Sequence, residues 1–351
     1  MDFTLTDERQ MLQDTLRRYL ADKYTTKARN KILESDTGIS ATIWSELADL
    51  GVIGALFSEE QGGFGGAGFD ITTVFEELGR AGVVEPFLDT AVLGGRLIAA
   101  LGDADQQALL EKVIAGSLHL AVAHGEPTSR YDLGRVETTA VQNGAEIVLN
   151  GRKAVVVNAE AAGSLIVSAR ESGAADDADG ISLFLVPADS AGVALRGYPM
   201  LAGGRAAEIT LDNLRLPASA RLGAAGEAYP AIAAAVAAAS VALSAEALGA
   251  METATELTRG YLMTRQQFGR PIGTFQALQH RFSDLLIELE QARSAVINAA
   301  GHLADDPLSR DRHIAAARNL IGRAGRVVAE EAIQMHGGLA MSQEYELAPI
   351  A

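Results

Sequence analysis

The sequence predicts an α+β protein of several domains: an N-terminal α-helical domain, a middle antiparallel β domain and a C-terminal helical bundle. Two changes of hydrophobic period predict this order. Apolar residues recur at helical spacing up to about residue 117, at strand spacing up to about 225, and at helical spacing again beyond it. The expected domains are therefore 1–117, 118–225 and 226–351, and a chain of 351 residues is long enough for two or three.

The first domain is expected to begin with a helix capped by Thr6, because Asp7 and Glu8 follow in the first turn. Further helices are predicted over 40–50, 70–80, 90–101 and 105–116. The glycine-rich stretch 61–68 lacks the preceding strand and the following Lys-Ser/Thr of a phosphate-binding P-loop. It is interpreted as a loop that lets backbone segments approach closely.

The middle domain is predicted from short strand-like segments at 136–141, 146–149, 154–157, 164–169, 181–186, 193–196 and 208–211. The pair Asn150-Gly151 is expected to form a hairpin turn. Strands at this spacing indicate an antiparallel barrel or sandwich. Long helices are then expected from about 228 to 265, 274 to 305 and 310 to 335, and they suit an antiparallel bundle.

The composition excludes several classes of function. A formal charge of −16 argues against a nucleic-acid surface, which needs a basic patch. The sequence has no cysteine, which removes disulfides, thiolate nucleophiles, Fe–S clusters and cysteine-based zinc sites. The six histidines show no ligand spacing, so we expect no metal site.

The sequence gives no sign of a membrane location. Its N-terminus is acidic and amphipathic, without the pattern of a signal peptide. The uncharged stretch 228–245 is built mainly of alanine, which inserts poorly into lipid, so a buried core helix is favoured over a membrane span. We therefore expect a cytoplasmic protein.

One stretch combines features that suit a dinucleotide. Arg265 and Phe268 lie where the first long helix of the bundle breaks, and a new helix starts just beyond Gly273. An arginine pairs with pyrophosphate through two hydrogen bonds, a ring packs beside a base, and a helix start offers unpaired N–H groups to an anion. The alternative is a helix corner in which the phenylalanine is core and the arginine is solvated.

The same stretch, Arg-Gln-Gln-Phe-Gly-Arg-Pro-Ile with Phe-Gln-Ala-Leu-Gln-His after it, resembles the signature of the acyl-CoA dehydrogenases. Glu76-Glu77-Leu78-Gly79-Arg80 and Gln334-Met335-His336-Gly337-Gly338 are similar to other parts of that family, in family order. The resemblance implies the family's fold with a C-terminal four-helix bundle, whose last helix we expect to be incomplete at Ala351. Arg130-Tyr131-Asp132-Leu133 and Arg196-Gly197-Tyr198-Pro199 point to the small subunit of pimeloyl-CoA dehydrogenases.

The resemblance also implies a reaction and a cofactor. FAD takes a hydride from the β-carbon of an acyl-CoA thioester while a carboxylate removes an α-proton, and an electron-transfer flavoprotein accepts the electrons. In the family, the Arg and Phe of an Arg-x-x-Phe-Gly motif and a Gln-x-x-Gly-Gly motif reach across a subunit interface to the ADP half of a neighbouring subunit's FAD. The positions that match here, and are expected to bind the cofactor, are Arg265, Phe268, Gln276, Gln334, Gly337 and Gly338. For 334–338 alone, a plain helix cap with glycine is the alternative.

The flavin-facing positions depart from the family pattern. The family's Thr-Glu-Pro loop aligns with 125–132, where the threonine has become Gly125 and a serine has become Tyr131. The family's Trp-Ile-Thr-Asn strand aligns with 155–158, where Val155 and Val157 replace the ring and the hydroxyl. Three hydroxyl contacts are lost, each worth about 1 kcal/mol, and a bulky phenol is added.

The catalytic residues stay unknown. One family position for the base falls near Ala239 and Ser240, which are not acids, and the commoner position falls beyond Ala351. Glu59, Glu60 and Glu126 are carboxylates that we do not nominate, because surface and structural roles are far commoner.

These features lead to a working hypothesis with alternatives. The chain is expected to be the small subunit of a heteromeric acyl-CoA dehydrogenase, paired with a large subunit as a heterodimer or heterotetramer. Its substrate would be a pimeloyl-CoA-like or bulky acyl-CoA. The alternatives are a self-sufficient homotetramer with its base after residue 351, a structural subunit without nucleotide contact, and an oxidase or reduced-flavin monooxygenase.

Overall fold

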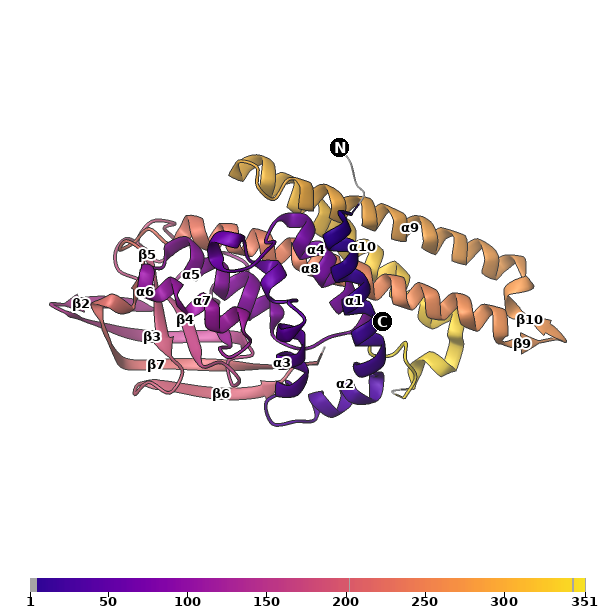
Figure 1. Ribbon diagram of the computed structural model, residues 1–351, viewed down its shortest axis with the longest axis horizontal. Helices are drawn as coiled ribbons and strands as arrows, with labels where there is room; N and C mark the ends of the chain where they lie inside the picture. Colours follow the sequence, from indigo (N-terminus) through magenta and orange to yellow (C-terminus); the bar gives the residue numbers. More distant parts are fainter. Residues whose placement is uncertain (1–4, 202, 343, 351) are drawn as a thin grey trace. The chain divides into compact units, whose positions relative to one another are not determined.

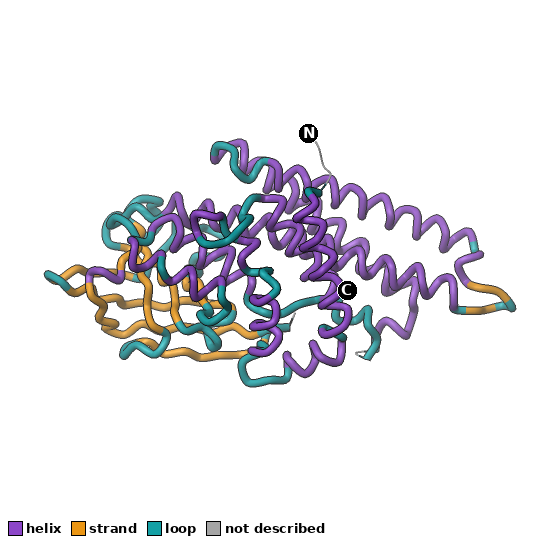
Figure 2. The backbone as a smooth tube through the Cα atoms, viewed as in Figure 1, coloured by secondary structure: helices purple, strands orange, loops and turns teal. Residues whose placement is uncertain are grey.

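The computed structural model describes residues 5–201, 203–342 and 344–350, and by internal contacts the chain falls into two compact units. The first comprises 1–31, 67–83 and 240–351, and the second comprises 32–66 and 84–239. Figure 1 labels the elements, and Figure 2 separates helices, strands and loops by colour. The predicted domain boundaries at 117/118 and 225/226 stay a prediction.

The first unit is helical. Its elements are α1 (Asp7–Lys23), most of α2 (Thr26–Leu33), α4 (Gly68–Ala81), most of α8 (Tyr229–Thr264), the short strands β9 (Gln266–Gln267) and β10 (Arg270–Pro271), η5 (Ile272–Thr274), α9 (Gln276–Gly301), α10 (Pro307–His336) and η6 (Gly337–Met341). The predicted first cap is present, because the Thr6 side chain accepts a hydrogen bond from the backbone N–H of Arg9.

Close packing of α4 against α8 explains one glycine of the family-like segment. A Cβ on Gly79 would lie 1.9 Å from the Glu246 carbonyl oxygen, and one on Gly249 would lie 1.9 Å from that of Glu76. The backbones of the two helices are in direct contact at these positions, and only glycine, which has no side chain, fits there. Beside this contact, Arg80 and Arg293 pair with the buried carboxylate of Glu252.

The second unit contains a sheet and several short helices. The helical elements are α3 (Ala41–Asp49), η1 (Gly54–Leu56), η2 (Glu59–Gln61), the π-helix η3 (Leu88–Gly95), α5 (Arg96–Leu101), α6 (Ala104–Gln107), α7 (Leu109–Ile114) and η4 (Ala218–Ala220). The strands are β1 (Leu120–Ala123), β2 (Thr139–Asn143), β3 (Glu146–Val157), β4 (Ser164–Arg170), β5 (Ile181–Pro187), β6 (Val193–Pro199), β7 (Arg205–Pro217) and β8 (Arg221–Leu222).

The eight strands form one sheet in the order β6-β7-β3-β2-β4-β5-β8, with β1 beside β4. Most pairs are antiparallel, but β1 and β2 both run parallel to β4. Inward-facing residues such as Ile147, Leu165 and Phe184 form a common core. The mixture of helices and a mainly antiparallel sheet confirms the predicted fold class.

One local prediction was wrong. Asn150-Gly151 is not a turn, because both residues lie inside β3; the turn between β2 and β3 is at Gly144, with φ +64°. Gly151 is needed for a different reason, since a Cβ there would lie 2.4 Å from the Thr138 hydroxyl oxygen. The predicted helix 90–101 is confirmed as helical, with its first half in the π-helix η3 and its second half in α5.

By length and hydropathy alone, α8 could cross a membrane. However, 61% of its most apolar window is buried within the protein, and the core helix of a soluble protein passes the same test. The structure therefore gives only weak support for a membrane span.

Candidate functional site

The first predicted cofactor motif forms a projecting β-hairpin between α8 and α9 (Figure 1). Phe268 and Gly269, with φ +54° and +78°, form its turn, which is the left-handed pattern of the tightest hairpin loops. A positive φ is unusual for a bulky residue. It presents the Phe268 ring to solvent with 91% of its surface exposed. The predicted chain break is therefore a structured hairpin.

Arg265 and Gln276 lie on either side of this hairpin. The Ile272 N–H donates to the Arg265 carbonyl at 2.8 Å, which closes the hairpin base. Gln276 is the first residue of α9, whose N-cap, Phe275, provides no capping side chain. Both side chains are exposed, and within the described chain the Arg265 guanidinium has no hydrogen bond or ion pair. The exposure of Phe268 excludes the alternative in which this ring belongs to the core. The other half of that alternative, a solvated arginine, agrees with the exposed Arg265 side chain.

The second motif lies at the end of α10. Gly337 caps the helix with φ +64°, and its N–H bonds back to the carbonyls of Gln334 and Ile333. The helix-cap alternative thus accounts for Gly337. It does not account for Gly338, because that residue has no left-handed φ and a Cβ on it would meet nothing within 4 Å. The described chain alone gives no reason for glycine at 338.

The supports of the two motifs touch each other. The Tyr261 ring on α8 stacks on the His336 ring on α10 with centroids 4.6 Å apart. Arg265 is one helical turn beyond Tyr261, and Gly337 follows His336 directly. The structure therefore brings the two motifs to the same end of the helical unit, although within the described ranges no side-chain hydrogen bond, ion pair or ring contact joins the six predicted residues. Their role in binding the cofactor stays a prediction.

The loop 125–132 in the second unit is organised by a buried ion pair. The Glu126 carboxylate accepts hydrogen bonds from the N–H groups of Glu137 (2.7 Å) and Thr138 (3.0 Å) and from the Lys153 ammonium (2.7 Å). The Lys153 side chain is fully buried and also donates to the Ser168 hydroxyl at 2.9 Å. The loop is thereby fixed to strands β3 and β4.

Both charges of this pair are shifted by their surroundings. Burial lowers the pKa of Lys153 to about 8, although Glu126 favours its charged form. Burial alone would raise the pKa of Glu126, but the Lys153 charge and the hydrogen bonds outweigh it and lower that pKa. Glu126 is therefore held as an ion by three donors and is not free to remove a proton from a substrate.

The strand 155–158 carries two left-handed residues. Val155, with φ +53°, sits at a β-bulge between β3 and β7 and is 58% exposed; Asn158 has φ +55°. The Ala154 N–H donates to the Gly125 carbonyl at 2.8 Å, so loop and strand are neighbours. A β-branched residue in this region costs of order 1–3 kcal/mol and often marks a functional site.

The position of Tyr131 differs from the expectation that its phenol fills the flavin side. Its side chain is fully exposed and packs into no pocket of this chain. The Ser129 hydroxyl is used within the loop, where it accepts from the Glu126 N–H at 2.9 Å. Of the departures read from the sequence, the loss of hydroxyl groups at 125 and 157 stands, while crowding by Tyr131 is not observed.

Asp89 is a buried carboxyl group that sequence reasoning missed. It lies in η3, and the Asn158 amide donates to its carboxylate at 3.2 Å. Burial raises the pKa of Asp89 to about 7, with smaller opposing effects from its hydrogen bonds. The only signal in the sequence is a single acid within an apolar segment. Lys153 gives the same kind of signal in β3.

The described residues supply no evident catalytic base at the positions considered. The Ser240 hydroxyl accepts from Arg318 at 3.1 Å, and Glu59 and Glu60 are exposed in η2. No group of three or more metal-ligating side chains occurs within 5–201, 203–342 and 344–350.

Comparison with protein-family models matches three parts of the chain. Residues 6–117 match the N-terminal domain of acyl-CoA dehydrogenase, 121–214 its middle domain and 210–351 its C-terminal domain. Among curated proteins, the probable acyl-CoA dehydrogenase YngJ of Bacillus subtilis is 29% identical, over 98% of this chain and 92% of its own length. Acyl-CoA dehydrogenase FadE12 of Mycobacterium tuberculosis is 28% identical, over 99% and 90%.

Solved structures of acyl-CoA dehydrogenases are also similar to this chain. The Tcur3481-Tcur3483 steroid ACAD variant is 32% identical with a TM-score of 0.86, covering 99% of this chain and 91% of its own. The ChsE4-ChsE5 complex from Mycobacterium tuberculosis has 25% identity and a TM-score of 0.88, covering 100% and 92%. Butyryl-CoA dehydrogenase from Megasphaera elsdenii has 26% identity and a TM-score of 0.90, covering 100% and 93%. This chain is an oxidoreductase that belongs to the acyl-CoA dehydrogenase family, whose members depend on FAD.

Proposed function

We propose that this chain is the small subunit of a heteromeric acyl-CoA dehydrogenase and binds the ADP half of the FAD whose flavin ring lies in a partner subunit. The observation that carries the proposal is a contrast between two sites. The ADP-side positions match the family and are open, whereas the flavin-side positions lack the family's hydroxyl groups.

The ADP side fits the cofactor. Arg265 is exposed and has no partner in the described chain, so its guanidinium is available for two hydrogen bonds to a pyrophosphate. Around Gly338 there is open space where a Cβ would stand, which allows a phosphate to approach the backbone N–H. The exposed Phe268 ring provides an apolar surface beside an adenine.

The flavin side fits poorly. Gly125 and Val157 offer no side-chain hydrogen bond, and the nearby carboxylate of Glu126 is already satisfied by Lys153 and two backbone N–H groups. A flavin ring bound there would lose about 1 kcal/mol for each missing hydrogen bond. This difference favours a flavin ring that is held by another subunit.

Two of the solved relatives support a heteromer. Their names join two proteins, Tcur3481 with Tcur3483 and ChsE4 with ChsE5, and the first is described as a steroid enzyme. By this similarity we propose a bulky acyl-CoA as the substrate. A pimeloyl-CoA-like substrate is a narrower proposal that rests only on 130–133 and 196–199.

In the proposed complex FAD supplies the acceptor for the hydride, and the partner subunit supplies the base. The residues of this chain bind and orient: Arg265 neutralises pyrophosphate charge, and the backbone N–H of Gly338 donates a hydrogen bond. An electron-transfer flavoprotein is the proposed electron acceptor, and the cytoplasm is the proposed location.

The test is flavin retention in a complex co-expressed with the product of the adjacent gene. We expect Arg265→Ala to lower the flavin bound per complex by at least tenfold under dilution, because a charged hydrogen-bonded contact is worth about 1.5–3 kcal/mol. Arg259→Ala is the matched control, since Arg259 is also exposed and lies six residues earlier. Equal flavin retention in both variants would contradict nucleotide contact by Arg265 and favour the structural subunit.

Two enzyme alternatives remain distinguishable. A self-sufficient homotetramer with its base beyond residue 351 would bind one flavin per chain when expressed alone. An oxidase or monooxygenase would show rapid reaction of the reduced flavin with oxygen.

A further inference from the structure

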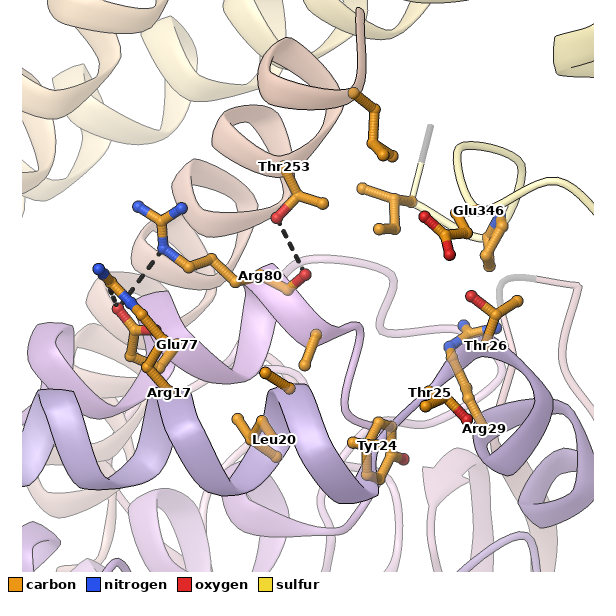
Figure 3. Close-up of a pocket in the computed structure, with 15 residues that line it drawn as sticks. Arg17, Leu20, Tyr24, Thr25, Thr26, Arg29, Glu77, Arg80, Thr253 and Glu346 are labelled. Carbon is orange, nitrogen blue, oxygen red and sulfur yellow. Dashed lines mark hydrogen bonds and ion pairs between the residues drawn. The ribbon is translucent and has the colours of Figure 1, made fainter. Parts of the chain in front are cut away.

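A pocket of about 380 Å³ lies inside the helical unit, bordered by α1, α2, α4, α8 and the segment 346–350 (Figure 3). Its volume falls within the range of small-molecule sites. None of the six predicted cofactor residues lines it. Its lining combines three arginines with apolar side chains, which is a combination that needs explanation.

Two of the three guanidinium groups are paired. Arg17 donates to both carboxylate oxygens of Glu77, at 2.9 and 2.6 Å. Arg80 forms ion pairs with Glu77 and with the buried Glu252. These two arginines are therefore held by the protein's own carboxylates and are not available for a ligand.

Arg29 is different. Only 9% of it is exposed, and its Nε donates to the Gly82 carbonyl at 2.8 Å. No carboxylate within the described residues forms an ion pair with it. Burial lowers the pKa of Arg29; a smaller electrostatic contribution from Tyr24 opposes that shift, and no carboxylate does. A buried charge without a counter-ion is costly, so an anion in the pocket would stabilise it.

The surroundings of Arg29 define the anion. Thr25 and Thr26, about one helical turn before Arg29, add hydroxyl groups on the same side of the pocket (Figure 3). The rest of the wall is largely apolar and includes Leu20, Leu257 and Ile350. A planar guanidinium matches a carboxylate through two parallel hydrogen bonds. The lining therefore suits a carboxylate head with a hydrocarbon tail.

Of the two carboxylates that line the pocket, Glu77 is paired with Arg17 and Arg80, so Glu346 is the one whose charge opposes an anion. It is exposed, belongs to the same pocket and has no ion-pair partner within the described chain. Its charge does not contribute to the pKa shift of Arg29. Its negative charge at the pocket would weaken the binding of a carboxylate. Removing that charge should therefore strengthen binding, which is the opposite of the effect expected from replacing Arg29.

We propose that this pocket binds a small organic carboxylate with an apolar tail, whose head pairs with Arg29 and whose tail packs on Leu20, Leu257 and Ile350. The site requires no flavin and no partner chain. A failure of this proposal would therefore leave the proposed function untouched, and a failure of the proposed function would leave this proposal untouched.

The test is isothermal titration calorimetry of this chain with octanoate, octan-1-ol and inorganic phosphate as probes. We expect octanoate to bind, octan-1-ol to bind at least tenfold more weakly for lack of charge, and phosphate to bind at least tenfold more weakly for lack of a tail. Octanol or phosphate binding as tightly as octanoate would overturn the proposal, as would the absence of octanoate binding at millimolar concentration.

Three variants sharpen the result. Arg29→Gln should weaken octanoate at least tenfold, Glu346→Gln should strengthen it severalfold, and Leu257→Trp should block the tail. Arg29 also holds the Gly82 carbonyl, so Arg29→Gln could fail to fold. The other two variants leave that contact intact, and unchanged octanoate affinity in both would overturn the proposal.

Discussion

Replacing Lys153 by Met should strongly destabilise the sheet unit, because it leaves the buried carboxylate of Glu126 without its cation. Lys153 is fully buried, and its Nζ lies 2.7 Å from the Glu126 carboxylate. Breaking a buried pair by removing one partner costs about 3–5 kcal/mol. Two backbone donors remain on Glu126, so we expect a loss of about 3 kcal/mol, at the lower end of that range.

The double variant Glu126→Gln/Lys153→Met isolates the charge effect. It removes both charges while keeping similar volume, so we expect at least about 1 kcal/mol more stability than in Lys153→Met alone. Glu126→Gln alone should be milder at pH 9 than at pH 7. Burial has already lowered the pKa of Lys153 to about 8, and above that value the lysine loses its charge.

Urea unfolding followed by circular dichroism measures these differences at constant pH. Lys112→Met is the matched control, because Lys112 is exposed on α7 and its replacement should change stability by no more than about 0.5 kcal/mol. A loss below about 1 kcal/mol for Lys153→Met, with no recovery in the double variant, would refute the argument that this pair fixes the loop 125–132.

Two other predictions concern pH and helix packing. Because burial raises the pKa of Asp89 from 3.8 to about 7, the folded protein holds a proton that the unfolded chain has lost, and stability should fall as pH rises from about 4 to about 7. Asp89→Asn should remove this loss of unfolding free energy, which amounts to up to about 4 kcal/mol at pH 8. Parallel profiles of unfolding free energy against pH for the wild type and the variant would exclude this role of Asp89. Gly79→Ala should cost about 2 kcal/mol or more in urea unfolding, because its Cβ would strike the Glu246 carbonyl, whereas Gly260→Ala, with nothing within 4 Å, should be neutral or stabilising. Equal stability of these two glycine variants would show that the helices part at little cost.

The sequence predicted the long elements because their signals are local and repeated. Thr6 with Asp7 and Glu8 marks the start of α1, and the apolar stripes beyond residue 228 mark three helices that the structure has as α8, α9 and α10. Most strands were found individually, but β1 and β8 were not predicted and β3 was divided in two. Its interior Asn150-Gly151 carries the strongest turn signal in a sequence, and the contact with Thr138 that requires Gly151 is not visible locally.

The polar groups of the site were harder to predict because their partners lie far apart in the sequence. Glu126 and Lys153 are 27 residues apart, and Asp89 and Asn158 are 69 apart. Nothing in either local sequence says that these side chains meet. Likewise, the left-handed φ of Phe268 and Val155 follows from a hairpin turn and a β-bulge, which depend on strand pairing.

The measurement that tests the central claim most directly is the flavin content of this chain expressed alone and co-expressed with the product of the adjacent gene. We expect a colourless protein alone and a yellow complex with about one flavin for each pair of unlike chains. One flavin per chain in the protein expressed alone would contradict it, because the flavin side at Gly125 and Val157 would then hold the ring unaided.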